Sequence, residues 1–394
     1  MLICLFLIDS IASGFNMGAT ASLLPEIAEE LTLTHTQIGV IWAAPPLAMM
    51  LFSLIGGSLG DRIGVKRLIT LALIWEAIFA GARALLPSFW WLSATMFCWG
   101  ISEACIIPNL HKAVGDWFDQ AEMGRANGLL IGGPIFGIAI GSMLGASILS
   151  PILRGWKGVM WLTGGITLVV LIIWIILAKE QQLTVPPKKV SLLKGLKVVF
   201  KIKNIWLLAI IESCIIGGYL SWIGMFPDIL VSREVSPGVA GLYTSILTWT
   251  VLVTTIIGTY TSDRLGIRKP FMWPLLIVAG VSFSLQGFFI GAPLVYILVL
   301  TGLVSGTAVG LPRAIALETE GVRPQLGGSA IGLMFTLNRL GALTWPILMG
   351  ALMDYTGLYW TPLVLVGLLF FISAGVSFFL KETGAKARHE SILY

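Results

Sequence analysis

The sequence predicts an all-α membrane protein with twelve transmembrane helices. Of its 394 residues, 57% are hydrophobic and 11% are charged, and the mean hydropathy is +0.92. Soluble domains contain about 25% charged residues, so this chain lacks the polar surface that water requires. Long apolar runs such as 157–178 and 358–380 match the ~20 residues that a helix needs to cross a bilayer. A membrane β-barrel would instead show alternating segments of about ten residues.

Twelve apolar segments are long enough to be membrane spans, and short polar turns separate them. A polar turn between two such segments is expected at a membrane surface, because charges cannot lie among lipid tails. The expected spans are 2–24, 36–57, 68–86, 89–111, 127–149, 157–178, 204–227, 239–260, 271–290, 293–315, 327–350 and 358–380.

The distribution of Lys and Arg predicts the orientation of the chain. Twenty of these residues lie in the even-numbered loops and the C-terminal tail, and only Arg83, Arg154, Lys157 and Arg233 lie in the odd-numbered loops. Since positive loops stay in the cytoplasm, both termini are expected there, in a multi-pass protein of the plasma membrane. The net charge of +5 reflects this bias. It therefore gives no reason to expect a nucleic-acid partner.

A charged turn occurs twice, half a chain apart. The first copy reads Gly57-Gly-Ser-Leu-Gly60-Asp61-Arg62-Ile-Gly64-Val-Lys66-Arg67, and the second spans 258–269. Asp61 and Asp263, like Arg62 and Arg264, are 202 positions apart. Pairs 204 positions apart, such as Pro108 and Pro312, extend the repeat. The sequence therefore predicts an N-terminal six-helix bundle (1–178), a polar cytoplasmic linker (179–203), a C-terminal six-helix bundle (204–380) and a cytoplasmic tail (381–394).

The first turn resembles the signature loop of the major facilitator superfamily, Gly-x-Leu-Gly/Ala-Asp-Arg-x-Gly-x-Lys/Arg-Arg. This resemblance implies two six-helix bundles in parallel repeat, with a solute held between them during alternating access. It also implies a cytoplasmic gate in which Asp61 approaches a helix N-terminus and the basic residues meet Asp116, Asp119 or Glu122. The residues assigned to the gating motif are Gly57, Gly60, Asp61, Arg62, Gly64, Lys66, Arg67, Arg125, Asp263 and Arg264.

A second resemblance narrows the family. Gly100-Ile-Ser-Glu103-Ala104-Cys-Ile-Ile-Pro108 is similar to a segment of the anion:cation symporter branch, as are Asp116-Trp117-Phe118 and Gly155-Trp156-Lys157. The branch implies transport of organic anions, often with protons, and Asp9 and Glu103 as the proton-coupling groups. Many members place an Arg seven residues before the glutamate, where this chain has Met96.

Away from their ends, the expected spans contain the charged residue types Asp9, Glu76, Glu103, Glu212 and Arg339. Each would cost about 2.5–3.5 kcal/mol if it were charged at the bilayer centre, so most must face a cavity, pair or be neutral. Asp9 begins a polar stripe at helical spacing, followed by Ser13, Asn16 and Thr20. Such a stripe either lines a polar pathway or caps neighbouring groups within the protein.

The expected substrate-binding residues are polar or aromatic side chains near the centre of the spans. Arg339 offers a planar fork for a carboxylate, and the alternative is a structural ion pair with Glu212, Asp9 or Glu103. The aromatic residues suit a solute with both polar and apolar surfaces, or else fill ordinary helix contacts. The full set is Arg339, Asn16, Tyr219, Trp222, Glu212 and Asn338.

Glycines recur at about four-residue steps between Gly128 and Gly145. In lipid, small residues allow helix backbones to approach closely. The stripe therefore predicts either static helix packing or a surface on which the two bundles rock.

Together these patterns predict a secondary transporter that couples a proton gradient to symport of a small organic anion, a carboxylate or sugar acid. An anion exchanger or exporter using Arg339 is the alternative, and a membrane sensor without transport is a remote one. No enzyme, metal site or cofactor is expected, because the three histidines (His35, His111, His389) are scattered and the four cysteines lie in spans. The expected partners are the solute and the lipid bilayer, and the chain is expected to be a monomer.

Overall fold

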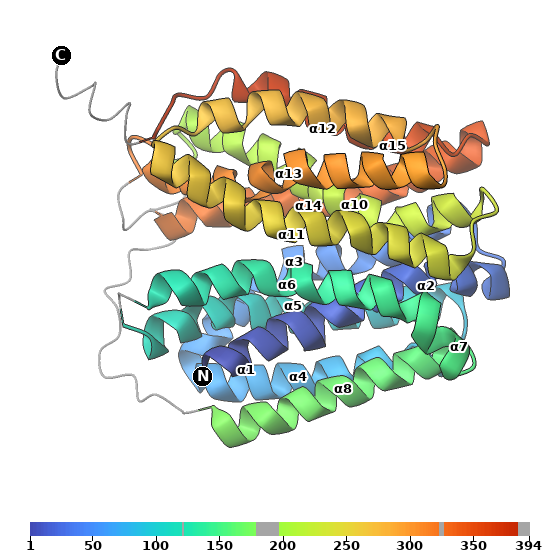
Figure 1. Cartoon of the computed structure of the whole chain (residues 1–394). Coiled ribbons are helices and arrows are strands. Elements are labelled where there is room, and N and C mark those ends of the chain that lie inside the picture. The colour runs from blue at the N-terminus through green and yellow to red at the C-terminus, as the bar shows by residue number, and fades with distance from the viewer. Residues whose placement is uncertain (120–121, 179–196, 323–326, 385–394) are drawn as a thin grey trace, which may run out of the picture. The chain divides into compact units, whose positions relative to one another are not determined.

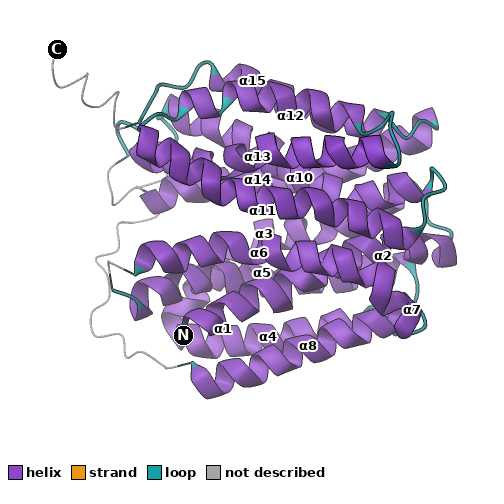
Figure 2. Ribbon diagram, viewed as in Figure 1, coloured by secondary structure: helices purple, strands orange, loops and turns teal. Residues whose placement is uncertain are grey.

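The computed structural model describes residues 1–119, 122–178, 197–322 and 327–384. Each of the twelve expected spans coincides with a helical stretch, and no β-strand occurs in these ranges (Figure 2). Among the described residues, nine helices are long and apolar enough to cross a membrane, and Lys269–Leu285 and Thr361–Ser377 are shorter apolar helices. The predicted all-α membrane fold is confirmed.

The first six helical stretches follow the predicted spans closely and extend several of them. The first stretch is continuous but contains a wide π-helical segment at Asp9. The elements are α1 (Leu2–Leu7), η1 (Ile8–Phe15), α2 (Asn16–Leu31), α3 (His35–Ile63), α4 (Val65–Ala82), α5 (Phe89–Trp117), α6 (Met123–Leu144), η2 (Gly145–Leu149), α7 (Ser150–Ile152) and α8 (Trp156–Leu177).

The second set of six shows the same alternation of long helices and short turns. Its elements are α10 (Lys203–Val231), α11 (Pro237–Leu265), η3 (Lys269–Phe271), α12 (Trp273–Leu285), α13 (Ala292–Glu318), α14 (Gly327–Thr356) and α15 (Thr361–Ser377). Of the predicted linker 179–203, residues 179–196 lie outside the described residues.

Local sequence explains where several helices begin and end. Thr34 caps α3, because its side chain accepts from the backbone N–H of Gln37 and the Gln37 side chain accepts from the Thr34 N–H. Gly64 separates α3 from α4 at φ +93°, a conformation that side-chain-bearing residues rarely adopt. Ser88 caps α5 by accepting from the N–H of Trp91.

The chain forms two compact units. The first comprises Met1–Gln182, Ile223–Trp249 and Pro346–Gly357, and the second comprises Leu183–Trp222, Thr250–Trp345 and Leu358–Tyr394. The units therefore divide α10, α11 and α14, whereas the predicted boundaries at 178 and 204 come from the sequence repeat and stay a prediction.

Polar contacts at the start of α3 attach two of these distant segments to the first unit. Asp354 accepts from the backbone N–H groups of His35 and Thr36, at 3.1 and 2.8 Å. Asp228 lies 2.6 Å from Nδ1 of His35. Carboxylates are favourable at a helix N-terminus, so Asp354 holds the C-terminal part of α14 there, while Asp228 on α10 contacts the His35 side chain.

Within the first unit, α4 and α8 lie side by side (Figure 1), and α6 packs against η1 and α2. Glycines bring α6 close to these segments. A Cβ atom at Gly137 would lie 1.8 Å from the carbonyl oxygen of Ser10, and one at Gly141 would lie 2.3 Å from that of Phe15. For these two glycines, static helix packing accounts for the predicted stripe. Gly128, by contrast, has nothing within 4 Å of such an atom.

Candidate functional site

The structure brings the two predicted proton-coupling residues together in the first unit. Asp9 lies on η1 and Glu103 on α5, and each is only 5% exposed. The hydroxyl of Ser13, one turn after Asp9, donates to Oε1 of Glu103 at 2.6 Å. The two carboxylates are near enough for their charges to interact. This buried pair forms a centre at which a bound proton would remove charge from the protein interior.

A buried arginine lies in the same unit, although the sequence analysis placed it in an exposed loop. Arg83 is 1% exposed, and its Nη1 donates to Asn16 Oδ1 at 2.7 Å and to Thr20 Oγ1 at 2.8 Å. Its guanidinium carbon is 5.5 Å from the ring of Trp99. Trp99 in turn donates to Oε1 of Glu76 at 3.2 Å. The polar stripe of the first helix is thus linked to a positive charge on the third span.

This arrangement also accounts for Glu76, for which the sequence offered no partner. Its carboxylate is fully buried and interacts electrostatically with both Arg83 and Glu103. Three buried carboxylates (Asp9, Glu76 and Glu103) therefore lie in one unit with the Arg83 cation. Uncompensated buried charges are costly, so the free energy of this site depends on how many protons the three acids hold.

A second polar group lies in the second unit and contains three predicted substrate-binding residues. Glu212 on α10 is 1% exposed, and its Oε1 accepts from Nε of Arg313 at 2.9 Å and lies 3.5 Å from Nδ2 of Asn338. Arg313 and Arg339 both lie against Phe335, with their guanidinium carbons 4.7 and 5.5 Å from the ring centroid. Arg313 was not among the predicted site residues, because its position near the end of an expected span made it a loop charge.

The predicted aromatic residues are buried in the packing of the second unit. Tyr219 is 5% exposed and stacks on Trp222 with a centroid distance of 6.4 Å. Trp222 is fully buried, donates to Oε1 of Gln286 at 2.7 Å and packs edge-on against Phe283. This setting matches the alternative interpretation, in which aromatic residues fill helix contacts. Their contact with a solute stays a prediction, as does that of Asn16, which belongs to the first unit.

The first gating turn contacts the end of α5. Asp61 pairs with Lys112 at 2.8 Å, and the expected approach of Asp61 to a helix N-terminus stays a prediction. Among the described residues, Arg62 and Lys66 form no ion pair with Asp116, Asp119 or Glu122. Gly60 lies close to Asn109 on α5, since a Cβ atom at Gly60 would lie 1.8 Å from Oδ1 of Asn109.

The second gating turn is a denser network. Arg268 pairs with Asp263 and, at 2.7 Å, with Glu318. These carboxylates, Glu318 first, hold the pKa of Arg268 above its usual range. Glu382 accepts from the backbone N–H groups of Arg268 and Lys269, both at 2.8 Å. Arg125 and Arg264 are exposed.

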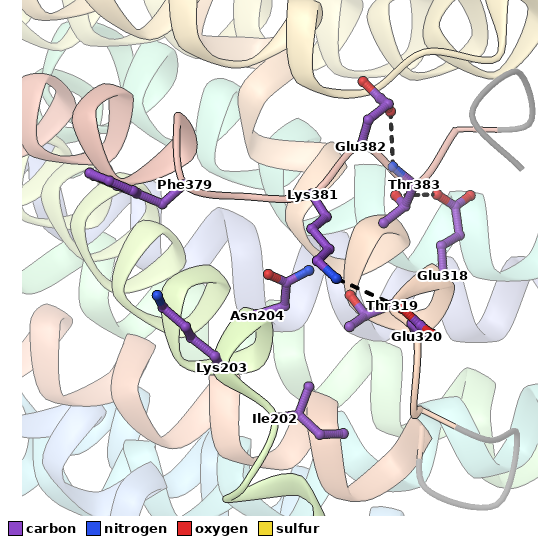
Figure 3. A pocket seen from close by; sticks show the side chains of 10 residues that line it. All are labelled: Ile202, Lys203, Asn204, Glu318, Thr319, Glu320, Phe379, Lys381, Glu382 and Thr383. Carbon is purple, nitrogen blue, oxygen red and sulfur yellow. Dashed lines mark hydrogen bonds and ion pairs between the residues drawn. The ribbon is translucent and has the colours of Figure 1, made fainter. Parts of the chain in front are cut away.

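A separate crevice of about 700 Å³ lies where α10 begins and α13 ends (Figure 3). Thr383 donates to Glu318 there at 2.9 Å, and Lys381 lies 3.9 Å from Glu320. None of the predicted site residues lines it, so it is not assigned to the solute. Its lining residues are Ile202, Lys203, Asn204, Glu318, Thr319, Glu320, Phe379, Lys381, Glu382 and Thr383. Within the described ranges, no group of three or more His, Cys, Asp or Glu residues could hold a metal ion.

Comparisons with known proteins agree with this architecture. A hexuronate transporter of Bacillus subtilis (strain 168) is 25% identical, with 96% of this chain and 94% of the relative aligned. A 3-(3-hydroxy-phenyl)propionate transporter of Escherichia coli (strain K12) is 24% identical over 87% of this chain and 84% of its own length. A probable sulfoacetate transporter of Cupriavidus necator is 23% identical over 96% and 92%.

Solved structures show the same fold. A bacterial homologue of the human lysosomal transporter Spinster has a TM-score of 0.81 at 16% identity, with 96% of this chain and 95% of that chain covered. The nucleoside transporter NupG has a TM-score of 0.76 at 14% identity, covering 96% and 97%. The sequence profile of the Major Facilitator Superfamily matches residues 6–233 and 219–392. The chain is therefore a multi-pass membrane transporter that belongs to the Major Facilitator Superfamily.

Proposed function

We propose that the chain is a proton-coupled symporter of a small organic anion of the carboxylate or sugar-acid class, working by alternating access. Relatives named as transporters of hexuronate, 3-(3-hydroxy-phenyl)propionate and sulfoacetate support this class, because all three solutes carry a carboxylate. D-Glucuronate, a hexuronate, is accordingly the first solute to test.

The observation that carries the coupling proposal is the buried contact between Ser13 and Glu103 beside Asp9. An ionised carboxylate at this depth is costly, and a proton removes the charge. Uptake of a proton at Asp9 or Glu103 therefore makes the conformational step with bound solute less costly. Coupling follows if the solute binds best when the proton is present.

Uptake of D-glucuronate into proteoliposomes with an imposed pH gradient tests this proposal. Asp9→Asn and Glu103→Gln are expected to lose accumulation against a concentration gradient while retaining counterflow exchange. Glu29→Gln is a matched control, because Glu29 is an exposed carboxylate of the first unit. Accumulation that persists in both Asp9→Asn and Glu103→Gln would show that these residues are not the coupling groups.

A second candidate function is anion exchange or export through Arg339. The placement of Arg339 and Arg313 against Phe335 favours it, since two guanidinium groups attract an anion without any proton. Counterflow that is independent of a proton gradient and is lost in Arg339→Ala would support exchange. A transport-dead sensor, the remote alternative, would bind D-glucuronate but show neither uptake nor counterflow.

We further propose that the protein lies in the cell membrane as a monomer, with both termini in the cytoplasm and the proton gradient as its driving force. Cysteine accessibility at the C-terminal tail and the mass of the purified protein in detergent test the orientation and the oligomeric state.

A further inference from the structure

Arg313 is held at one edge of its guanidinium and open at the other. Nε donates to Glu212, and the guanidinium face lies on the ring of Phe335 at 4.7 Å. No residue in the described part of the chain forms a hydrogen bond or an ion pair with its two Nη atoms. The Arg313 side chain is 32% exposed. With Nε bound and one face against Phe335, the Nη edge is the part of the guanidinium that can still form hydrogen bonds.

Arg313 and Glu212 both lie within helices rather than in the connecting turns. Arg313 is five residues before the end of α13, about 7–8 Å along the axis, and Glu212 is nine residues after the start of α10, about 13–14 Å. An arginine placed here loses part of its hydration, which strengthens any charge-assisted hydrogen bond that it makes.

We propose that Arg313 binds the carboxylate of the transported anion through its Nη atoms. This inference rests on the proposed function, because it assumes an organic anion as solute. The two Nη donors match the two oxygens of a carboxylate, which a lysine could not bind in the same bidentate way. Arg339, on the same ring of Phe335, adds a second positive charge to the site.

Glu212 is the positioning residue of this site. Its carboxylate is buried and accepts from Nε of Arg313, which fixes the rotation of the guanidinium plane. Phe335 fixes the same plane from one face. A guanidinium restrained in two directions loses little further freedom on binding, so its affinity for a carboxylate depends on Glu212 even though Glu212 need not touch the solute.

The experiment measures the Kd for D-glucuronate by calorimetry on the purified full chain, and KM in proteoliposomes. Arg313→Gln is expected to raise both by about 10- to 100-fold, the effect of losing a charge-assisted hydrogen bond. Arg313→Lys keeps the charge but loses the fork, and a smaller increase is expected. Lys201→Gln removes an exposed cation from the same unit and is expected to match the wild type.

Two variants of Glu212 test whether Glu212 acts by positioning the Arg313 guanidinium or only by stabilising the fold. Glu212→Gln retains an acceptor for Nε and is expected to change the Kd by less than about threefold. Glu212→Ala removes the acceptor, and an increase similar to that of Arg313→Gln is expected. If Arg313→Gln fails to purify as a folded protein, Arg313→Lys decides, and an unchanged Kd in it overturns the inference.

The outcomes distinguish this inference from the proposed function. If the wild type binds D-glucuronate and Arg313→Gln and Arg313→Lys bind it with the same Kd, the role of Arg313 is overturned and the transport proposal is unaffected. A wild-type protein that binds none of D-glucuronate, 3-(3-hydroxyphenyl)propionate and sulfoacetate would overturn the proposed substrate class, and the inference with it.

Discussion

The hydroxyl of Ser13 donates to Oε1 of Glu103 across 2.6 Å and so joins the first membrane helix to α5. The contact lies one turn from Asp9, on the wide π-helical segment η1. It connects two residues that are 90 positions apart in the chain. The coupling proposal depends on this arrangement, because it places a hydrogen-bond donor on a buried carboxylate.

Ser13→Ala removes that donor from Glu103. We expect the free energy of unfolding to fall by about 0.5–2 kcal/mol, the range for a hydrogen bond between membrane helices. Gradient-driven uptake of D-glucuronate should fall as well, whereas Ser13→Thr should retain both properties. Thermal denaturation and proteoliposome uptake measure the two effects. Equal stability of Ser13→Ala and the wild type would contradict the contact.

Gly137→Ala is expected to disrupt the packing of α6 against η1. The added Cβ atom would lie 1.8 Å from the Ser10 carbonyl oxygen, so the helices must separate, at a cost of about 1–3 kcal/mol. Gly128→Ala is the matched control, because nothing lies within 4 Å of its added atom. The melting temperatures of the two purified variants test this directly. Similar values for both would show that α6 and η1 are farther apart than described.

Arg83→Gln should destabilise the first unit strongly. Arg83 is buried, and its loss leaves Asn16 and Thr20 without their donor and Glu76 without its nearby positive charge. Breaking such a buried charged contact costs about 3–5 kcal/mol. Arg154→Gln, at an exposed arginine, should be neutral. Fluorescence-detected size-exclusion chromatography and thermal denaturation provide the comparison, and a stable Arg83→Gln variant would count against this network.

Arg268→Gln should loosen the second gating turn. Its guanidinium bridges Asp263 and Glu318 and is only 10% exposed, so we expect a loss of about 1–3 kcal/mol. Arg264→Gln is the control, because Arg264 is exposed on the same turn. Thermal denaturation in detergent separates the two variants. A larger effect at Arg264 would reverse the assignment of the structural arginine.

Most of the fold was predictable because lipid imposes strong constraints on sequence. A membrane span must be long, apolar and helical, so the twelve segments could be located from composition alone. The burial of Asp9 and Glu103 inside the protein was also predictable, because ionisable residues inside spans are rare and are costly if they face lipid. The repeated turn around Asp61 and Asp263 indicated the superfamily.

The pairing of charged side chains was not predictable from the sequence. Arg83 and Arg313 both lie near the ends of expected spans and were counted as loop residues, but Arg83 is buried and Arg313 pairs with the buried Glu212. Lys112 was likewise counted as a loop residue, and it pairs with Asp61 of the gating turn. The contacts between side chains on different helices depend on how each helix is rotated about its axis, and a single sequence does not give that rotation.

By itself, the sequence determined that this protein is an α-helical membrane protein with an internal repeat and ionisable residues inside its spans. Hydrophobic length, charge bias and periodicity are local properties and are sufficient for this conclusion, whereas the transporter class came from the resemblance of the turn at 57–67 to the superfamily signature. Only the tertiary structure decided that Ser13 contacts Glu103, that Arg83 joins Asn16 to the region of Glu76, and that Glu212 restrains Arg313. Such contacts form between helices far apart in the chain, because packing, rather than local preference, sets their rotation and depth.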